Sequence, residues 1–257
     1  MTTPVIELQN VTIELGGQII LEDISLQVMP GECLVVVGPS GQGKTVLLKT
    51  IVGIYKPKTG RVFINGQDLN SFTQREKREL ARRVGMLFQQ NALFDSLTAV
   101  ENVAFPIREH TTMSDVDVVF KSAYFLKAVG LEDSAFKYPH ELSGGMQRRL
   151  GIARALALDP DIVLYDDPTA GQDPIRSDNM AQLILKLKQS NNGTIVVVTN
   201  DMFVAYEMAD RIIMVTQRQI IDTGTVEQTK SCPEPRVQQF INGQLTGPLT
   251  ENGTYVL

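Results

Sequence analysis

Eight residues near the N-terminus form the clearest chemical pattern in the chain, Gly38-Pro39-Ser40-Gly41-Gln42-Gly43-Lys44-Thr45. The apolar run 33–37 precedes them, and a helical pattern over 46–52 follows. Glycines let the backbone turn its N–H groups toward an anion, and a helix N-terminus adds its positive end. Lys44 would then reach the β- and γ-phosphates of a nucleotide, and the Thr45 hydroxyl would bind Mg²⁺. A glycine-rich turn with a solvated lysine is the alternative, but the strand–loop–helix context favours a phosphate loop.

Two carboxylates follow another apolar run, 162–165. Asp166 and Asp167 stand at the carboxyl end of an expected strand, where open α/β sheets bind ligands. Asp166 suits a Mg²⁺ contact, and Asp167 could orient or deprotonate an attacking water. Acidic residues after a strand often only cap the next turn, but a phosphate loop in the same chain favours the catalytic interpretation.

A second anion-binding helix N-terminus is predicted in the stretch Leu142-Ser143-Gly144-Gly145-Met146-Gln147. Ser143 is a helix cap, and the two glycines expose the first N–H groups of the helix. An ordinary capped helix is the alternative interpretation.

The elements that must position these residues alternate between strand and helix, which predicts an α/β fold with a mostly parallel, doubly wound sheet. Short strands at the start predict an N-terminal antiparallel β subdomain, and the strand-free stretch 91–158 predicts an inserted helical subdomain. The expected strands are 5–8, 11–15, 19–21, 24–28, 33–37, 61–64, 84–88, 162–165, 194–198 and 211–215. The expected helices are 46–52, 73–83, 98–109, 114–129, 143–158, 173–189, 202–209 and 235–240.

Composition describes a globular chain of 257 residues, 43% hydrophobic and 21% charged, long enough for a large core. The formal net charge of -5 and the absence of a long Lys/Arg run argue against nucleic-acid binding. Cys33 and Cys232 form neither a disulfide framework nor a zinc site, which fits a reducing cytosol. The sequence shows no export signal and no apolar stretch long enough to cross a bilayer, so a membrane role would need another chain.

Together the motifs resemble those of ATP-binding cassette (ABC) ATPases. Gly38–Thr45 looks like a Walker A motif, and 162–166 like a Walker B. The stretch 142–147 looks like the signature motif, which is nearly unique to that family. Gln89 matches the Q-loop glutamine, and 170–173 lies where the D-loop belongs. The resemblance implies a P-loop NTPase (RecA-like) core over 1–90 and 159–227, with a helical subdomain over 91–158 and a tail over 228–257.

The family resemblance implies that two copies pack head to tail, with each ATP between one copy's Walker A and the other's signature motif. The implied metal ligands are Thr45, Gln89 and Asp166, and the implied catalytic residues are Asp167, Gln89 and Asn200. The implied nucleotide contacts are Gly38, Pro39, Ser40, Gly41, Gln42, Gly43, Lys44, Thr45, Val46, Leu15, Ser143, Gly144, Gly145, Met146 and Gln147.

The family also implies a partner. ATP-driven dimerisation would power a separate membrane permease, whose coupling helix enters the surface formed by the helical subdomain and the Gln89 loop. The chain would lie in the cytoplasm, against the inner face of the membrane. Segments 91–98, 101–106, 171–174, 235–240 and 247–248 look more specifically like the ATPases of Mla/Mce-type lipid transporters. That resemblance implies a phospholipid or other hydrophobic substrate and a periplasmic lipid-binding partner reached through the permease.

Three positions depart from the family pattern. Asp167 stands where glutamate is usual, and a misplacement of about 1 Å can cost about a hundredfold in rate. Asn200 stands where histidine is usual; it can donate a hydrogen bond to a γ-phosphate but cannot carry a charge. Leu15 replaces the aromatic residue that stacks on adenine. We expect slow hydrolysis by a homodimer, with a partly degenerate subunit beside a more active one as the alternative.

Two other functions stay open at this point: a soluble ABC ATPase of translation or DNA repair, and an ATP-gated interaction module with little hydrolysis. The first class usually has two cassettes or long coiled-coil insertions, which this chain lacks. Arg148, Arg149 and Arg154 are expected to form a solvated helical face or to pair with the acidic core, without a catalytic role. His110 and His140 are expected to be structural or solvated.

Overall fold

A computed structural model describes residues 3–191, 193–251 and 254–255. The chain forms two compact units, one of Met1–Phe72 with Thr194–Leu257 and one of Thr73–Gly193. We call them unit 1 and unit 2. The predicted fold class is confirmed, since the chain combines an antiparallel N-terminal sheet with mostly parallel strands and helices. No helix in the described ranges is long and apolar enough to span a bilayer.

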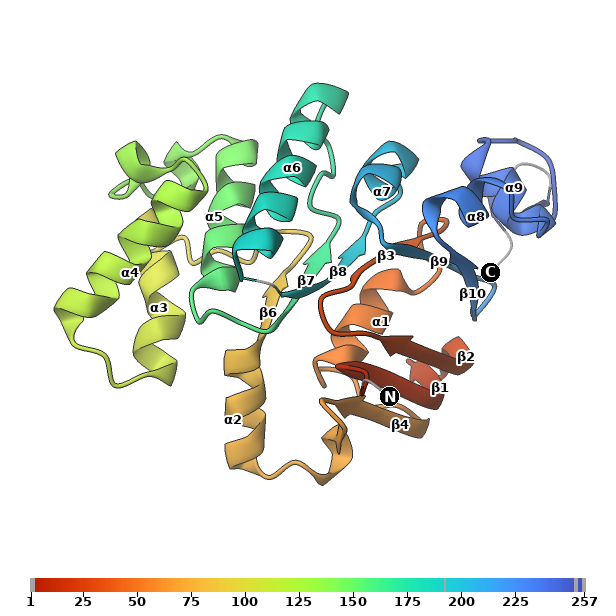
Figure 1. The fold of residues 1–257 in the computed structure, drawn as a ribbon, viewed down its shortest axis with the longest axis horizontal. Coiled ribbons are helices and arrows are strands. Elements are labelled where there is room, and N and C mark those ends of the chain that lie inside the picture. Colours follow the sequence, from red (N-terminus) through yellow and green to blue (C-terminus); the bar gives the residue numbers. More distant parts are fainter. Residues whose placement is uncertain (1–2, 192, 252–253, 256–257) are drawn as a thin grey trace. The chain divides into compact units, whose positions relative to one another are not determined.

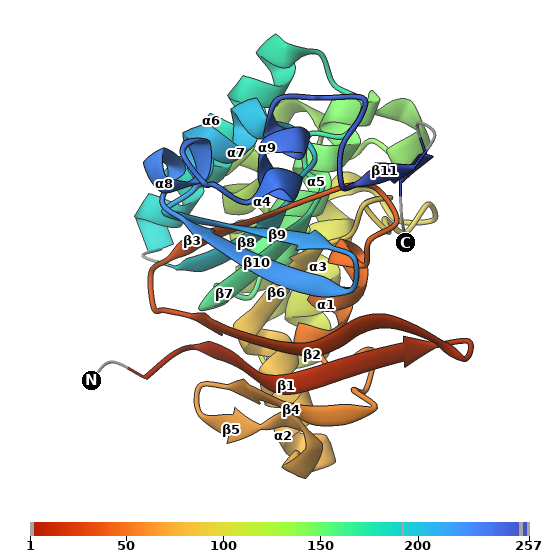
Figure 2. The ribbon, with the colours of Figure 1, turned by 90° about the vertical axis from the view of Figure 1, so that its right-hand side faces the viewer.

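Unit 1 begins with an antiparallel sheet of β1 (Ile6–Leu15), β2 (Gln18–Val28), β4 (Thr59–Ile64) and β5 (Gln67–Asp68), in the order β2-β1-β4-β5 (Figure 2). β1 and β2 are each continuous where we expected two shorter strands. Asn10 and Asp23 have left-handed φ angles of 49° and 50°, and the β1–β2 register shifts between Leu8 and Val11. A bulge therefore absorbs the interruption in the alternating pattern without ending either strand.

The second sheet of unit 1 places β3 (Cys33–Val37) between the parallel strands β8 (Thr194–Val198) and β9 (Arg211–Thr216). All residues of β3 and β8 are buried, as their continuous apolar runs predict. β10 (Gln219–Gly224) runs antiparallel to β9, and we did not predict it. The helices of this unit are α1 (Lys44–Ile51), α7 (Met202–Met208), α8 (Val226–Lys230) and α9 (Pro235–Ile241).

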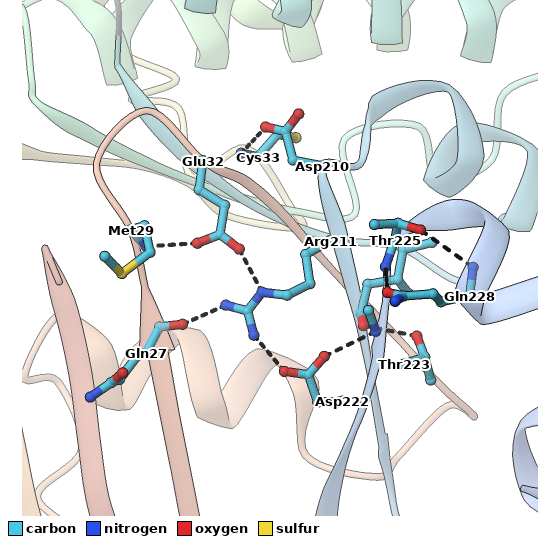
Figure 3. A network of polar contacts seen from close by, with 12 residues as sticks. Gln27, Met29, Glu32, Cys33, Asp210, Arg211, Asp222, Thr223, Thr225 and Gln228 are labelled. Carbon is cyan, nitrogen blue, oxygen red and sulfur yellow. Dashed lines mark hydrogen bonds and ion pairs between the residues drawn. The ribbon is translucent and has the colours of Figure 1, made fainter. Parts of the chain in front are cut away.

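Arg211 joins the two sheets of unit 1 (Figure 3). Its guanidinium donates to Glu32 at 2.7 Å, to Asp222 of β10 at 2.6 Å and to the carbonyl oxygen of Gln27 on β2. Burial acts to lower the pKa of Arg211, but the bonds and charges of Glu32 and Asp222 outweigh it and raise that pKa. The guanidinium of Arg211 thus links the start of β9 to both β2 and β10.

The C-terminal segment packs on its own unit through polar contacts. Gln239 is 3% exposed; its amide donates to Gln244 and Thr250 and accepts from the backbone N–H of Leu249. The segment is therefore organised around a buried amide, with the buried apolar side chains of Val237 and Leu249 in the same segment. Its last described strands, β11 (Thr250–Glu251) and β12 (Thr254–Tyr255), form a short pair.

Unit 2 contains α2 (Gln74–Arg83), β6 (Val84–Leu87), α3 (Ala99–His110), α4 (Asp115–Ala128), α5 (Gly144–Leu156), β7 (Ile162–Asp166) and α6 (Pro174–Asn191). β6 and β7 pair in parallel, and α3, α4 and α5 lie side by side (Figure 1). The capping box predicted at Thr73 is present and starts α2. Pro106 lies inside α3 without ending it.

Two glycines bring α5 against β6. A Cβ added to Gly85 on β6 would lie 2.2 Å from the carbonyl oxygen of Ala155, and one added to Gly151 on α5 would lie 2.6 Å from Leu87. Any larger residue at Gly85 would push the helix and strand apart. The helix that begins at the signature motif is therefore packed directly on the strand that leads to Gln89.

Candidate functional site

The phosphate-loop candidate folds as predicted, as a tight turn between β3 and α1. Gly38, Gly41 and Gly43 have positive φ angles of 134°, 81° and 95°. A Cβ added to Gly38 would lie 2.1 Å from the carbonyl oxygen of Val215 on β9, so only glycine fits there. These glycines close the loop at the carboxyl end of β3, where open α/β sheets bind ligands.

Lys44 begins α1 with its ammonium group folded back over the loop. Its Nζ donates to the carbonyl oxygens of Gly38 at 2.6 Å and Pro39 at 2.7 Å, and the residue is only 7% exposed. Gly43, at the cap position, provides no side chain to accept from the first N–H groups of the helix. A buried cation beside a helix N-terminus without a side-chain cap fits an anionic phosphate group.

Two further residues of the predicted site, Asn200 and Gln42, make hydrogen bonds within unit 1. Asn200, just past β8, donates from Nδ2 to the Oγ of Ser40 at 3.4 Å, so it lies beside the loop as predicted for a phosphate sensor. Gln42 accepts at Oε1 from the backbone N–H of Gln217 at 2.7 Å. The Gln42 side chain therefore anchors the loop to the turn between β9 and β10.

Ile20 of β2 is an apolar neighbour of the loop that sequence reasoning missed, whereas Leu15 of β1 was among the predicted nucleotide contacts. Leu15 is half-buried at the end of β1, opposite Gln18 in the hairpin. Ile20 of β2 lies against the loop, since its Cγ2 is 2.8 Å from a Cβ built on Gly43. The apolar pair Ile19-Ile20 in the sequence is the signal that could have identified it.

The carboxylate pair of unit 2 lies at the carboxyl end of β7, as predicted. Asp166 is the last residue of β7 and is 2% exposed, whereas Asp167 is half-buried. Asp167 has a φ of 53°. A left-handed conformation costs a non-glycine residue about 1–2 kcal/mol, and the following Pro168 favours an extended backbone instead. Such strained residues persist only where their surroundings hold them, and they cluster at active sites.

The signature candidate begins α5 in unit 2. The Oγ of Ser143 caps the helix by accepting from the backbone N–H of Met146 at 3.3 Å. A Cβ added to Gly144 or Gly145 would meet no atom within 4 Å, so the chain's own fold does not require glycine there. Gln147 instead holds the preceding turn, donating to Pro139 and Leu142 at 2.8 and 3.2 Å.

Of the two alternatives predicted for the arginines of α5, the solvated face is wrong for Arg148, and the interaction with the acidic core agrees with its contacts. Its guanidinium donates to the carbonyl oxygen of Asp167 at 2.6 Å and to that of Gln89 at 3.4 Å. Burial lowers the pKa of Arg148, and the charge of Asp167 partly opposes this. Gln89 is exposed and lies two residues past the end of β6.

The predicted solvated face of α5 is also wrong for Arg154. Its guanidinium donates to the carbonyl oxygens of Asn91 and Ala92, both at 2.7 Å, and lies 5.6 Å from the ring centre of Phe94. Burial lowers the pKa of Arg154. Asn91 and Ala92 have positive φ angles of 58° and 49°, so this arginine stabilises a strained segment two residues past Gln89.

The residues predicted to bind Mg²⁺ fit the way this ion is usually held. Mg²⁺ takes one or two protein oxygens and completes its shell with waters and substrate phosphates. Thr45 supplies a hydroxyl on α1, and Asp166 supplies a buried carboxylate at the end of β7. Within the part of the chain that the structure describes, no group of three His, Cys, Asp or Glu side chains could hold a metal.

Comparison with known proteins assigns the family. The family model described as "ABC transporter" matches residues 21–170, more than half of the chain. The chain belongs to the ABC transporter family. The match spans the phosphate loop, Gln89, the signature candidate and both carboxylates of the Walker B region, so the chain is an ABC ATPase that binds and hydrolyses ATP.

Relatives of this ABC ATPase match nearly its whole length. It is 41% identical over 249 residues to the intermembrane phospholipid transport system ATP-binding protein MlaF of Haemophilus influenzae, covering 97% of this chain and 94% of MlaF. It is 38% identical over 244 residues to the probable ribonucleotide transport ATP-binding protein mkl of Mycobacterium leprae, covering 95% of this chain and 70% of that protein.

Solved structures of ATP-binding cassettes also resemble this ABC ATPase. The dimeric post-hydrolysis state of the ATP-binding cassette MJ0796, bound to ADP and Pi, matches with a TM-score of 0.78 and 35% identity, over 85% of this chain and 98% of that one. CbiO1 of Clostridium perfringens, part of the transporter complex cbiONQ, matches with a TM-score of 0.80 at 23% identity, over 95% and 96%. The second likeness shows the fold alone.

Proposed function

We propose that this ABC ATPase powers a phospholipid transporter, as a head-to-tail dimer bound to a separate membrane permease. The observation that carries the proposal is the 41% identity over 97% of the chain to MlaF, a protein named for intermembrane phospholipid transport. The dimer would lie at the cytoplasmic face of the membrane. A periplasmic lipid-binding protein would complete the system through the permease.

The proposed nucleotide site follows from the loop geometry. The backbone N–H groups of Gly38 and of residues 40–46, together with the ammonium of Lys44, bind the phosphates. Thr45, Asp166 and Gln89 would hold Mg²⁺, which when bound would neutralise charge on the phosphates. The position of Lys44 supports its role, because its ammonium is held over the loop by the carbonyl oxygens of Gly38 and Pro39.

The proposed chemical step depends on two polar residues. Asp167 orients the attacking water and accepts its proton. Asn200 donates a hydrogen bond to a γ-phosphate oxygen, which its position beside Ser40 of the phosphate loop supports. Because Asn200 cannot carry a charge, it stabilises the transition state less than a protonated histidine would.

The head-to-tail dimer is supported by the exposed start of α5. The chain has one phosphate loop and one signature motif. Gly144 and Gly145 leave open space above the helix N-terminus, although nothing in their own chain needs that space. A phosphate held by a second copy accounts for both glycines. The dimeric MJ0796 structure supports the formation of a dimer.

The permease is proposed to dock on unit 2, in the helical subdomain 91–158 and the adjoining Gln89 loop. A groove of about 370 Å³ lies there, lined among others by Phe88, Phe94, Phe105 and Pro106. Phe94 and Phe105 are 40% and 39% exposed, with ring centres 4.6 Å apart. An apolar groove beside the Gln89 loop suits a short helix of the permease, which would then move the loop during the ATP cycle.

The transported molecule is tested by purifying the chain with its membrane partner and placing the complex in liposomes. We expect ATP-dependent transfer of a fluorescent phospholipid, absent when the same complex carries Lys44→Ala. ATP-dependent movement of a ribonucleotide without lipid transfer would instead match mkl and overturn the lipid assignment. Purification without any integral membrane protein would support the soluble alternative.

Replacing Asp167 with glutamate is expected to raise the ATPase turnover of the complex about tenfold, because the longer side chain restores reach to the water. The positive φ of residue 167 suits aspartate better than glutamate, so we also expect the melting temperature to fall by about 2–4 °C. Steady-state phosphate release and a thermal melt measure the two effects. An equal or lower turnover would show that the short carboxylate does not limit the rate, and near-zero turnover in both proteins would favour an interaction module.

A further inference from the structure

Arg148 connects the signature helix to the backbone of the proposed catalytic carboxylate. Its Nη1 donates to the carbonyl oxygen of Asp167 at 2.6 Å, and its Nη2 donates to that of Gln89 at 3.4 Å. Asp167 follows the end of β7, and Gln89 lies two residues past the end of β6. These strands are parallel neighbours within unit 2, so one guanidinium joins the carboxyl ends of both to α5.

The bond to Asp167 is suited to fixing the direction of its side chain. A hydrogen bond from a cation is stronger than one between neutral groups, and partial burial strengthens it further. The bonded oxygen belongs to the peptide plane that follows Asp167. With β7 fixed, rotation about the N–Cα bond of Asp167 away from its φ of 53° would move this carbonyl oxygen and the side chain together, which would break the bond and swing the carboxylate away.

Close packing of α5 against β6 brings the Arg148 backbone near the ends of the two strands. Gly85 and Gly151 bring α5 directly against β6, with no room for a Cβ at Gly85. The α5 backbone that carries Arg148 therefore has little freedom to shift relative to the strand ends. This packing keeps the Cα of Arg148 within reach of the strand ends, where its guanidinium bonds the carbonyl oxygen of Asp167.

We propose that Arg148 is a positioning residue for ATP hydrolysis, which holds Asp167 in the conformation that directs its carboxylate. This inference rests on the proposed catalytic role of Asp167. Neither acceptor of Arg148 is a residue of the phosphate loop. Loss of Arg148 should therefore slow the chemical step and leave the affinity for nucleotide unchanged.

The first measurement is the steady-state turnover of the full-length chain with Mg-ATP. We expect Arg148→Ala to lower kcat about tenfold to a hundredfold with little change in KM. Arg148→Lys should recover part of kcat, because one ammonium can still reach one carbonyl oxygen. A KM that rises with an unchanged kcat, or an unchanged kcat, overturns the proposal.

A matched control lies at the opposite ends of the same strands. Arg83 precedes β6 and donates to Asp161, which precedes β7, at 2.8 Å. Arg83→Ala removes an arginine that joins the same two strands but contacts neither Asp167 nor Gln89. We expect its kcat to stay within about twofold of the wild type, since exposed ion pairs contribute little. An equal loss of kcat in Arg83→Ala would mean that any weakening of the strand pair slows hydrolysis, and would overturn the specific role of Arg148.

A double-mutant cycle with Asp167→Asn separates positioning from general damage. If Arg148 acts through Asp167, adding Arg148→Ala to Asp167→Asn causes no further loss of kcat. Losses that multiply overturn the proposal. Wild-type turnover in Asp167→Asn alone would instead refute the catalytic role of Asp167, whereas an inactive Asp167→Asn beside a fully active Arg148→Ala refutes only the role of Arg148.

Discussion

Replacing Lys44 with alanine is expected to abolish ATP binding and hydrolysis. In the structure the buried ammonium group donates to Gly38 and Pro39, which keeps it over the loop that encloses the phosphates. Two charge-assisted hydrogen bonds to phosphate, at about 1.5–3 kcal/mol each, correspond to about a hundredfold or more in affinity. The variant also leaves two loop carbonyls without their lysine donor, which disturbs the loop itself.

Titration calorimetry with Mg-ATP measures the loss directly. Lys49→Ala is the matched control, because Lys49 lies on the same helix and its ammonium is 5.8 Å from the ring centre of Tyr55. We expect Lys49→Ala to bind ATP like the wild type. An unchanged ATP affinity in Lys44→Ala would refute the assignment of 38–45 as the phosphate loop.

Replacing Gly144 with aspartate is expected to lower ATP hydrolysis by about a hundredfold or more. The added side chain meets nothing in its own chain, and a carboxylate in the first turn of α5 is favourable for the isolated helix. The chain should therefore keep its melting temperature and the ATP affinity of its own phosphate loop. Hydrolysis fails because the new charge faces the γ-phosphate held by the second copy.

Val116→Asp is the control for this change. It places a carboxylate in the first turn of α4, another helix of unit 2, at a residue that is 63% exposed. We expect its hydrolysis to equal that of the wild type. If Gly144→Asp also keeps full activity, the start of α5 does not approach a nucleotide.

Local patterns predicted most of the fold. The continuous apolar runs predict β3 and β8 to the residue, and the Thr73–Glu76 capping box predicts α2 to within one residue. β10 was missed because its turn, Gln217-Arg218, adopts positive φ without the glycine or asparagine that normally indicates such a hairpin. The fold of the polar C-terminal segment was not predicted, because a buried glutamine amide organises it and gives no pattern in the sequence.

The candidate site likewise has features that the sequence predicted and contacts that it did not predict. The phosphate loop, Asp166 and the cap at Ser143 are local features, so spacing along the chain reveals them. The contacts of Arg148 join residues 19 and 59 positions apart, and they end on backbone carbonyls that every residue type possesses. The left-handed backbone of Asp167 likewise has no sequence signal, because aspartate before proline ordinarily predicts an extended residue.

Mixing two inactive variants tests most directly whether the ATP site is shared between two copies. A head-to-tail dimer of one Lys44→Ala chain and one Gly144→Asp chain keeps one complete site, formed by the intact phosphate loop of the second and the intact α5 start of the first. Random pairing in an equal mixture leaves about a quarter of the sites complete. We therefore expect the mixture to hydrolyse ATP well above either variant alone. A mixture as inactive as its components would contradict the shared site and the head-to-tail dimer.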